Sequence, residues 1–417
     1  MNIGYACLAI AVPGTALKSC TLKNADTDRL LSLIASNLDA LEKLIDYNAR
    51  SGIKLFRISS DLIPFGSSAA FRLPWQSIYA QKLSDIGRRI AHAGMRVSMH
   101  PGQYTVLNSP DDSVAERAVD DLRYHASVLD SLGLGCEHKI ILHLGGVYGD
   151  KKAAQRRFLS RYATLEPAIQ SRLVLENDDK LFHIVDVLDT AATGGIPVVY
   201  DTLHNAVNPA DARRSDLDWI KLCRATWTER DGAPKIHYSQ QAPQKKPGAH
   251  SNSIGIDAFL AFYGQLSDID IDIMLEVKDK NLSALKCMHC VSNRGIGALE
   301  IEWARYKYAV LEHSAERYQA VRILLQDKGA YPAAEMYRLI EKSLDLPVSP
   351  GSGENAARHV WGYFKEKASA SEKQRFEMLL HKWTRGEAEL RAVKGFLFRL
   401  AQTYQEDYLL KGYYFDL

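Results

Sequence analysis

Lys139-Ile-Ile-Leu-His-Leu144 opens the unit of sequence that decides the fold, and Arg172-Leu-Val-Leu175 closes it. Both runs are short, apolar and rich in isoleucine, leucine and valine, which is typical of strands buried on both faces of a parallel sheet. A helix-like segment separates them. The same alternation continues from residue 1 to about residue 300. It predicts a parallel sheet wrapped by helices.

Eight such runs can be counted, separated by helical segments such as 26–51 and 114–132. Eight strands favour a closed α/β architecture, the eight-stranded parallel β/α (TIM) barrel, over an open doubly wound sheet. No glycine-rich phosphate motif follows the first run, so no nucleotide cofactor is expected. The predicted strands are 2–8, 53–58, 96–99, 139–144, 172–175, 197–200, 234–238 and 272–277.

The sequence changes character after Glu302, where strand-like runs end and helical patterning takes over. We therefore expect residues 1–302 to form the barrel and residues 303–417 to form an all-helical domain. Its one evident break is the proline- and glycine-rich stretch 347–353, which is read as a loop. The predicted helices are 303–325, 333–344, 353–367, 371–385 and 387–410.

Composition limits the class of protein but does not name a partner. A chain of 417 residues, 46% of them hydrophobic, can bury a large core. Neither a signal peptide nor a membrane span is evident, and the six cysteines are scattered, so a cytoplasmic protein without membrane contact is expected. The lone Cys287-Met-His-Cys290 is read as ordinary packing. A formal net charge of +2 does not indicate the ligand.

Metal-binding residue types stand at the ends of six consecutive predicted strands. In a β/α barrel these ends meet at one mouth, where active sites are built. A single residue of this kind is more often a polar cap, but six buried together without a metal would each cost several kcal/mol. Mixed imidazole and carboxylate ligands suit zinc, manganese or iron. The predicted ligands are His100, His143, Glu176, Asp201, His237 and Glu276.

Two more histidines join this set by sequence context. His204 follows Asp201 in Asp201-Thr-Leu-His204, and His250 closes a loop that begins at Gln244. Eight ligands are enough for three ions. The remaining histidines have no such company and are read as surface or core residues; examples are His92, His125, His138, His183 and His313.

The motifs around these residues resemble, as a set and in register, those of the ultraviolet damage endonucleases. That family is related to the endonuclease IV type of abasic-site nuclease, and the likeness spans roughly residues 1–300. The motifs are Phe56-Arg-Ile-Ser-Ser-Asp-Leu-Ile-Pro-Phe65, His100-Pro-Gly-Gln-Tyr104, Leu142-His-Leu-Gly-Gly146, Leu175-Glu-Asn-Asp178, Tyr200-Asp-Thr-Leu-His204, Lys235-Ile-His-Tyr-Ser239, Pro247-Gly-Ala-His250 and Met274-Leu-Glu-Val-Lys-Asp279.

The resemblance implies a DNA repair endonuclease with three divalent metal ions. Manganese is expected and zinc is the alternative. The enzyme would act on damaged double-stranded DNA at the nucleoid and cut on the 5′ side of photoproducts and some other lesions, by attack of a metal-generated hydroxide. By analogy, one ion takes two histidines, a bridging glutamate joins it to the second ion, and two histidines hold the third. The sets are His100 and His143; Glu176 as bridge; Asp201, His237 and Glu276; His204 and His250.

One feature departs from the endonuclease IV pattern, because Ala249 precedes His250 where those enzymes have an Asp-x-His pair. The third ion is therefore short of a carboxylate. Lys235, two residues before His237 on the same strand face, is the candidate replacement if its amine is carboxylated. A phosphate contact by Lys235 is the alternative, and either role makes it a candidate catalytic residue beside Glu176.

Lesion recognition is expected from Gln103 and Tyr104, which follow the His100-Pro-Gly turn and could wedge into a base stack. The alternative is that this pair packs under the barrel rim. Tyr5 resembles a family residue that lines the lesion pocket, although Ala9 replaces an asparagine found in many relatives. The expected phosphate contacts are Arg57, Lys245, Lys246 and Lys278.

Other functions remain open at this point. An abasic-site nuclease, a metal-dependent sugar isomerase or epimerase, and a catalytically silent DNA-binding barrel all fit the same architecture. Residues 303–417 resemble an uncharacterised small helical domain, which supplies no activity. Basic residues of that domain could form a face that follows DNA: Arg358, Lys365, Lys367, Lys373, Arg375, Lys382, Arg385, Arg391, Lys394 and Arg399.

Overall fold

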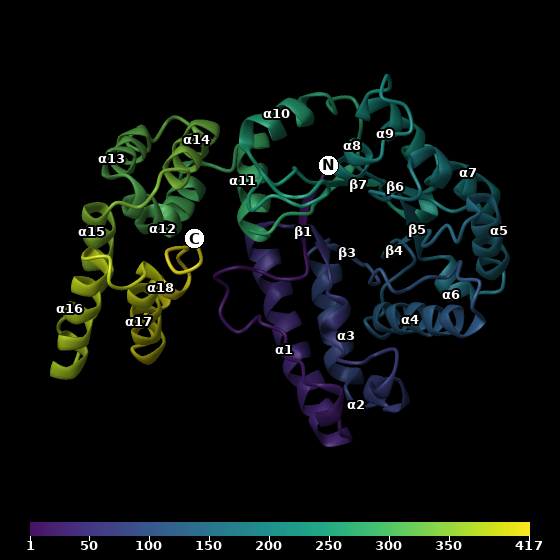
Figure 1. Ribbon diagram of the computed structural model, residues 1–417, viewed down its shortest axis with the longest axis horizontal. Helices are drawn as coiled ribbons and strands as arrows, with labels where there is room; N and C mark the ends of the chain where they lie inside the picture. The colour runs from purple at the N-terminus through teal and green to yellow at the C-terminus, as the bar shows by residue number, and fades with distance from the viewer. The chain divides into compact units, whose positions relative to one another are not determined.

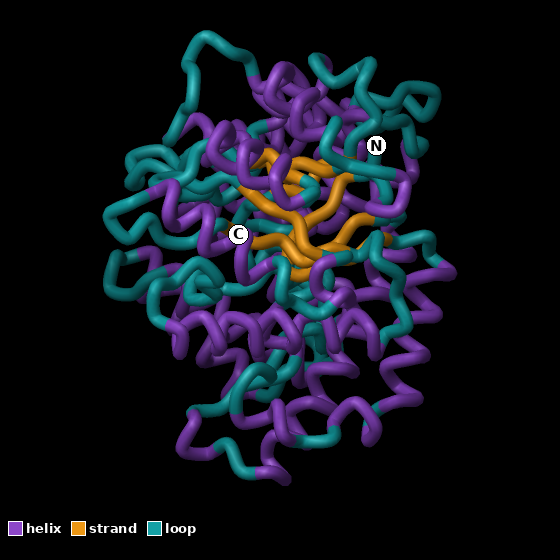
Figure 2. Tube along the Cα trace, turned by 90° about the vertical axis from the view of Figure 1, so that its right-hand side faces the viewer, coloured by secondary structure: helices purple, strands orange, loops and turns teal.

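The computed structural model describes residues 1–417, except for the side chain of Phe71. Eight parallel strands close into a barrel in sequence order, and β1 pairs with both β2 and β8. The strands lie at the centre of the barrel part of the chain, and helices lie outside them (Figures 1 and 2). The predicted barrel is confirmed. Its strands are β1 Ile3–Ala6, β2 Leu55–Arg57, β3 Arg96–Met99, β4 Lys139–His143, β5 Leu173–Glu176, β6 Val198–Asp201, β7 Lys235–Tyr238 and β8 Asp272–Leu275.

The register of the strands brings the polar residues at their ends to one level. His143 on β4 is paired with Glu176 on β5, and Asp201 on β6 is paired with His237 on β7. Because side chains alternate across a strand, residues level with each other in this way point to the same side of the sheet. Strands β1 and β2 approach closely at Gly4, because a Cβ added there would clash with the Leu55 carbonyl oxygen.

Helices connect the strands, and their ends follow ordinary capping rules. The side chain of Asp26 accepts a hydrogen bond from Arg29 N at the start of α1, and Gly52 ends that helix in the left-handed region at φ 70°. The helices up to β8 and just beyond it are α1 Thr27–Ser51, α2 Trp75–Ile78, α3 Ala80–His92, α4 Asp112–Ser131, α5 Lys151–Tyr162, α6 Pro167–Gln170, α7 Ile184–Gly194, α8 Thr202–Val207, α9 Asp216–Arg224, α10 Ile256–Gly264 and α11 Asn281–Val291.

The barrel interior is apolar in its middle and charged at the amino-terminal ends of its strands. Ile141, Val174 and Val199 form a buried cluster inside it. Below them, the ammonium of Lys139 lies 2.6 Å from a carboxylate oxygen of Asp231. Lys139 is therefore paired, as the desolvation cost of a lone buried charge requires.

The chain divides into two compact units. The first comprises Met1–Ala9, Gly14–Ile254 and Ala261–Leu285, and the second comprises Ile10–Pro13, Gly255–Leu260 and Lys286–Leu417. Helix α12, Ile296–His313, runs without a break across residue 302. The domain limits 1–302 and 303–417 remain predictions.

The second unit is helical, as predicted, and its core contains a stacked pair, Trp361 and Phe376, with ring centroids 4.4 Å apart. Its helices after α12 are α13 Ala315–Leu324, α14 Ala333–Leu344, α15 Pro350–Trp361, α16 Ala370–Thr384, α17 Leu390–Thr403 and α18 Asp407–Leu410.

Three details of the predicted helices are wrong. The helix 303–325 breaks at Ser314, whose side chain caps α13 by accepting from Arg317 N. The loop 347–353 is partly helix: Ser349 caps α15, and Pro350 occupies its first turn, where proline needs no N–H partner. The helix 387–410 divides into α17 and α18.

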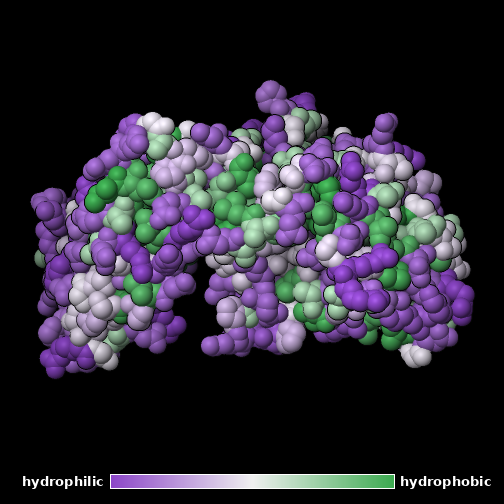
Figure 3. All heavy atoms as spheres, turned by 90° about the horizontal axis from the view of Figure 1, so that it is seen from above, coloured by the Kyte–Doolittle hydropathy of each residue, from purple (hydrophilic) through white to green (hydrophobic). Residues whose placement is uncertain are grey.

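Among the residues that the structure describes, no helix is long and apolar enough to cross a membrane. On the face shown in Figure 3, patches of hydrophobic residues are interrupted by hydrophilic ones.

Candidate metal centre

All six predicted strand-end ligands meet at the barrel mouth. Their candidate ligand atoms form two groups, and within each group the atoms lie within 4.8 Å of one another. One group is His100, His143 and Glu176. The other group contains Glu176 again, together with Asp201, His237 and Glu276. The two groups share one carboxylate.

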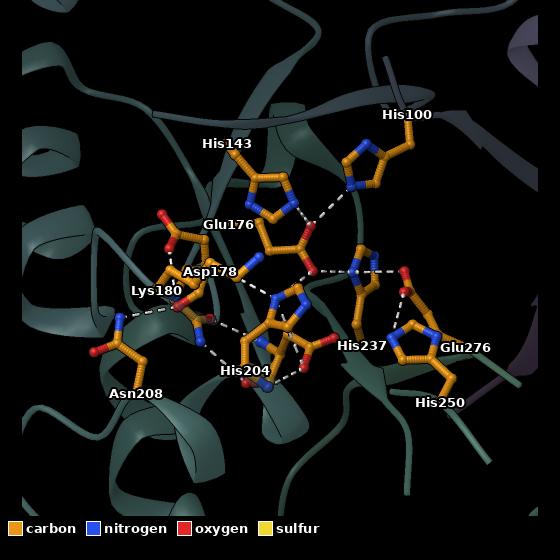
Figure 4. A network of polar contacts seen from close by, with 12 residues as sticks. His100, His143, Glu176, Asp178, Lys180, His204, Asn208, His237, His250 and Glu276 are labelled. Atoms are coloured by element: carbon orange, nitrogen blue, oxygen red, sulfur yellow. Dashed lines mark hydrogen bonds and ion pairs between the residues drawn. The ribbon is translucent and has the colours of Figure 1, made fainter. Parts of the chain in front are cut away.

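Glu176 lies between the groups and is 1% exposed. Its Oε2 is 2.9 Å from Nε2 of His100 and 3.5 Å from Nε2 of His143. Its Oε1 is 2.5 Å from Nδ1 of His237 and 3.9 Å from Nδ1 of His204. Figure 4 shows these rings on the two sides of the carboxylate. Each oxygen therefore faces a different set of imidazoles, which is the arrangement of a bridging ligand.

The second group also contains a buried guanidinium. Arg57 donates to Oε1 of Glu276 at 2.6 Å, and its NH2 group lies 2.9 Å from Nε2 of His237. Arg57 is only 7% exposed. In this arrangement it balances the charge of the ligand carboxylates, and its predicted contact with a DNA phosphate remains a prediction.

Asp201 is held in place by its neighbours in the chain and on the adjacent strand. Its Oδ1 accepts from His204 N at 2.7 Å. Asn177 clamps its backbone, because Asp201 N donates to Asn177 Oδ1 at 2.9 Å and Asn177 Nδ2 donates to the Asp201 carbonyl at 3.1 Å. Nothing in the sequence singles out Asn177, although it directly follows Glu176.

His204 and His250 lie at the edge of the cluster. The rings of His143 and His204 have centroids 5.6 Å apart, and His250 Nε2 is 3.8 Å from Oε2 of Glu276. Neither histidine belongs to the two groups that could hold an ion among the described residues. Their assignment to a third ion remains a prediction.

Burial and mutual charge shift the pKa values of these groups. Burial by itself would raise the pKa of Glu176, but His237 and His143 hold it well below its usual value. Burial raises the pKa of Asp201 to about 7, which His204 opposes. Burial lowers the pKa of His237 to about 4 against the pull of Glu176. His237 is therefore neutral beside an ionised Glu176, as metal ligation requires. His204 differs, because Asp201 and Glu176 outweigh the effect of burial and raise its pKa to about 9.

The donor set and its unsatisfied atoms fit divalent metal ions. Oδ2 of Asp201 and Nδ1 of His143 are buried without a hydrogen-bond partner in the structure. A buried polar atom without a partner costs free energy that a metal bond or a water molecule would recover. Two imidazoles with a carboxylate in one group, and three carboxylates with an imidazole in the other, match zinc or manganese better than magnesium.

Lys235 points into the barrel from β7, two residues before His237, and is 3% exposed. Among the described residues, its ammonium makes no hydrogen bond and no ion pair within 4.0 Å. Burial, with help from Arg96 and Arg57, lowers its pKa well below the usual value. This depth argues against the phosphate contact that was one of its two predicted roles.

The predicted lesion wedge lies on the surface. Gln103 is exposed and Tyr104 is 68% exposed, so the alternative of packing under the rim is wrong. The next residue anchors the turn, because Thr105 Oγ1 donates to Asp121 Oδ2 at 2.6 Å. The loop backbone is therefore anchored at Thr105, while the side chains of Gln103 and Tyr104 are exposed to solvent.

A second anchor of this loop was not predicted. Ser60 Oγ donates to the His100 carbonyl at 2.8 Å and lies 2.9 Å from Nε2 of the fully buried His125. His125, read from the sequence as a surface or core residue, lies in the core. Its link to the backbone of His100 has no sequence signal, because the two residues lie in different elements.

The remaining predicted DNA contacts differ in exposure. Lys245, Lys246 and Lys278 are exposed, and Nζ of Lys278 donates to Asn252 Oδ1 at 3.2 Å. Tyr5 is fully buried, and its hydroxyl donates to Asn48 Oδ1 on α1 at 2.8 Å. Its position leaves no surface for a lesion.

The CxxC motif lies on α11, where Cys287 is fully buried and burial raises the pKa of Cys290 to about 12. Neither cysteine belongs to a metal-capable group of the described residues. This agrees with the predicted packing role.

The predicted basic face of the helical unit has acidic neighbours. Six of its ten members pair with acidic side chains; they are Arg358, Lys365, Lys367, Arg385, Arg391 and Lys394. Of the other four, Arg375 lies over the ring of Phe396 at 5.6 Å. Acidic neighbours thus offset part of this charge, and a DNA-following face remains a prediction.

A closed β/α barrel whose strand ends bring imidazoles and carboxylates together defines a barrel enzyme of the metal-binding class. The chain belongs to the UV-endonuclease UvdE family, whose model matches residues 1–304. A second family, described as a protein of unknown function (DUF1722), matches residues 307–417.

Individual relatives agree with this family. A UV DNA damage endonuclease from Clostridium perfringens is 37% identical over 407 residues, which are 96% of each chain. One from Bacillus pumilus is 31% identical over 67% of this chain and 89% of its own. The crystal structure of SacUVDE covers 70% of this chain and 98% of its own, with a TM-score of 0.66 and 38% identity. These matches set aside the sugar isomerase alternative.

Proposed function

We propose that this protein is a metal-dependent DNA repair endonuclease that cuts the phosphodiester on the 5′ side of ultraviolet photoproducts, and of some other lesions, in double-stranded DNA. The observation that carries the proposal is Glu176, whose two oxygens face two different groups of candidate ligands. Curated relatives named UV DNA damage endonucleases support the choice of substrate.

Three divalent ions, manganese with zinc as the alternative, fit the number of candidate ligands. His100 and His143 would hold the first ion, and Glu176 would join it to the second. The second would also take Asp201, His237 and Glu276, while His204 and His250 would hold the third. When bound, such ions supply a hydroxide at neutral pH and offset charge on the phosphate oxygens.

The protein groups position this chemistry. Glu176 would fix the spacing of the two groups, because it is buried and contacts both. Lys235 would provide a further ligand after carboxylation, which its depth, its strand face and its lack of an acidic partner support. Arg57 would hold Glu276 and His237 in place through its hydrogen bonds to both side chains.

DNA would approach over the barrel mouth. Gln103 and Tyr104 would enter the stack at the lesion, which their exposure on an anchored loop supports. Lys245, Lys246 and Lys278 would contact phosphates. We do not extend this role to the buried Tyr5.

The test is nicking of irradiated supercoiled plasmid by purified protein. Untreated plasmid is the first control, and a duplex with one abasic site tests the related abasic-site activity. We expect cutting of irradiated DNA, loss of cutting after chelation, and recovery with manganese at least as good as with magnesium. Undiminished cutting by metal-free protein would refute the metal dependence, and no cutting of irradiated plasmid by metal-loaded protein would refute the substrate.

A further inference from the structure

The loop between β4 and α5 carries an exposed aromatic side chain close to the metal centre in sequence. It follows His143 directly and ends at Asp150, which caps α5. Tyr148 lies in this loop and is 47% exposed. It has no part in the function proposed above.

The backbone at Tyr148 is in the left-handed region, at φ 50°. Residues other than glycine rarely adopt it, and an aromatic side chain there is unusual. Gly149 next to it has φ 80°, so both central residues of this turn are left-handed. A non-glycine residue kept in such a conformation at a site mouth suggests a role for its side chain.

The Tyr148 ring packs on the loop backbone and on Arg157, and 47% of the residue is exposed. A Cβ added to Gly146 would lie 2.8 Å from the Tyr148 ring, so only glycine lets the ring lie so close to the loop. The guanidinium of Arg157 lies 5.5 Å from the ring centroid, and its Nε donates to the Asn108 carbonyl at 3.0 Å. The ring is therefore ordered before any ligand binds, which lowers the entropy lost on binding.

The same design is present in the neighbouring loop, where the wedge residue Tyr104 folds over Gly102, two residues before it. Asn108 ties the two loops together. Its Nδ2 donates to the Gly146 carbonyl at 2.7 Å, and its Oδ1 accepts from Gly146 N at 3.2 Å. Two exposed tyrosines thus stand on adjacent, linked loops that begin at two neighbouring candidate ligands.

We propose that Tyr148 is a second base-contacting residue, which stacks on a nucleobase uncovered when the duplex opens at a lesion. The inference rests on the proposed function. Aromatic rings stack on any base, so this contact would favour opened DNA without reading sequence. Intact duplex keeps its base faces covered, so the contact would raise discrimination between damaged and undamaged DNA.

The test compares Tyr148→Gly, Tyr148→Phe and wild type on a duplex with a single thymine dimer. Glycine suits the left-handed backbone, so the melting temperature should hold while kcat/KM falls about tenfold, mainly through KM. Phenylalanine keeps the ring and should stay within twofold of wild type. Leu222→Ala on α9 is the matched control, since Leu222 is 42% exposed and lies away from the strand-end loops.

A binding readout separates stacking from a structural role. With 2-aminopurine beside the dimer, wild type and Tyr148→Phe should quench its fluorescence on binding, and Tyr148→Gly should not. If Tyr148→Gly cuts within twofold of wild type, or if Tyr148→Phe loses as much as Tyr148→Gly, the inference is refuted. If wild type itself does not cut this duplex, the proposed function fails first and this inference with it.

Discussion

Asn108→Ala tests how far the two loops at the barrel mouth depend on one side chain. Asn108 is fully buried and joins the loop after β3 to the loop after β4 through both polar atoms of Gly146. Alanine removes the donor and the acceptor together. Neither Gly146 N–H nor its carbonyl would then have its partner.

The size of the effect follows from these contacts. Two hydrogen bonds contribute about 1 kcal/mol each, and more if the abandoned groups stay dry. Gly146 is half-buried, so water can replace part of the loss, and about 2 kcal/mol of unfolding free energy is expected for Asn108→Ala. For a barrel of this size that corresponds to a fall of about 5 °C in the melting temperature.

Thermal melts and amide exchange of segments 101–110 and 144–150 measure the change. Both segments should exchange faster in the variant, because each loses its tie to the other. Asn208→Ala is the matched control: Asn208 is half-buried and donates a single bond, 3.1 Å, to the Asp178 carbonyl, so a fall of no more than about 2 °C is expected. An unchanged melt and unchanged exchange in Asn108→Ala would refute the idea that this residue couples the loops.

Three further predictions address the centre, the wedge and the helical unit. Glu176→Gln should reduce turnover more than about 100-fold and weaken metal binding measured by calorimetry, with damaged-DNA binding retained; turnover within threefold of wild type would show that Glu176 is not the bridge. Gln103→Ala with Tyr104→Ala should lower discrimination between damaged and undamaged duplex about tenfold in competition binding, and full discrimination would place the wedge elsewhere. Burial, with Arg294 and Arg305, lowers the pKa of His289 to about 4, so the neutral ring stabilises the fold at pH 7 and this stability is lost as pH falls from about 6.5 toward 4. His289→Gln should therefore lose about 2 kcal/mol less than wild type between pH 7 and pH 5, and equal losses in the two melts would contradict the assignment.

The strands and the candidate ligands could be predicted because each is marked by a short, local sequence pattern. A short apolar run such as Ile140 to Leu142, repeated eight times between helical segments, predicts a strand, and the residue that closes it faces the barrel mouth by topology. The helix ends in the second unit could not be fixed this way. Ser314 fits a helix interior or a cap equally well in sequence, and the choice depends on the packing of the flanking helices.

The residues that support the candidate ligands were harder still to predict from the sequence. Asn177, Asn108 and Ser60 act through backbone groups of residues distant in sequence, and neither their type nor their spacing marks such a partner. For Tyr5 the strand was predicted but the role in a lesion pocket was not supported. Its place on β1 was right, but alternation turns its ring outward to α1, where Asn48 binds its hydroxyl.

The pairing of β1 with β8 also has a consequence for synthesis of the chain. Ile3 is paired with Ile273, so β1, which is synthesised first, can pair with β8 only after β8 has been synthesised. At about 5–20 residues per second, some 270 residues take roughly 15 to 50 seconds, during which one edge of β1 has no partner. Glu276 follows β8 directly, so the second ligand group becomes complete only when the barrel closes. A nascent chain that stalls before Leu275 therefore has an open sheet edge and an unfinished centre.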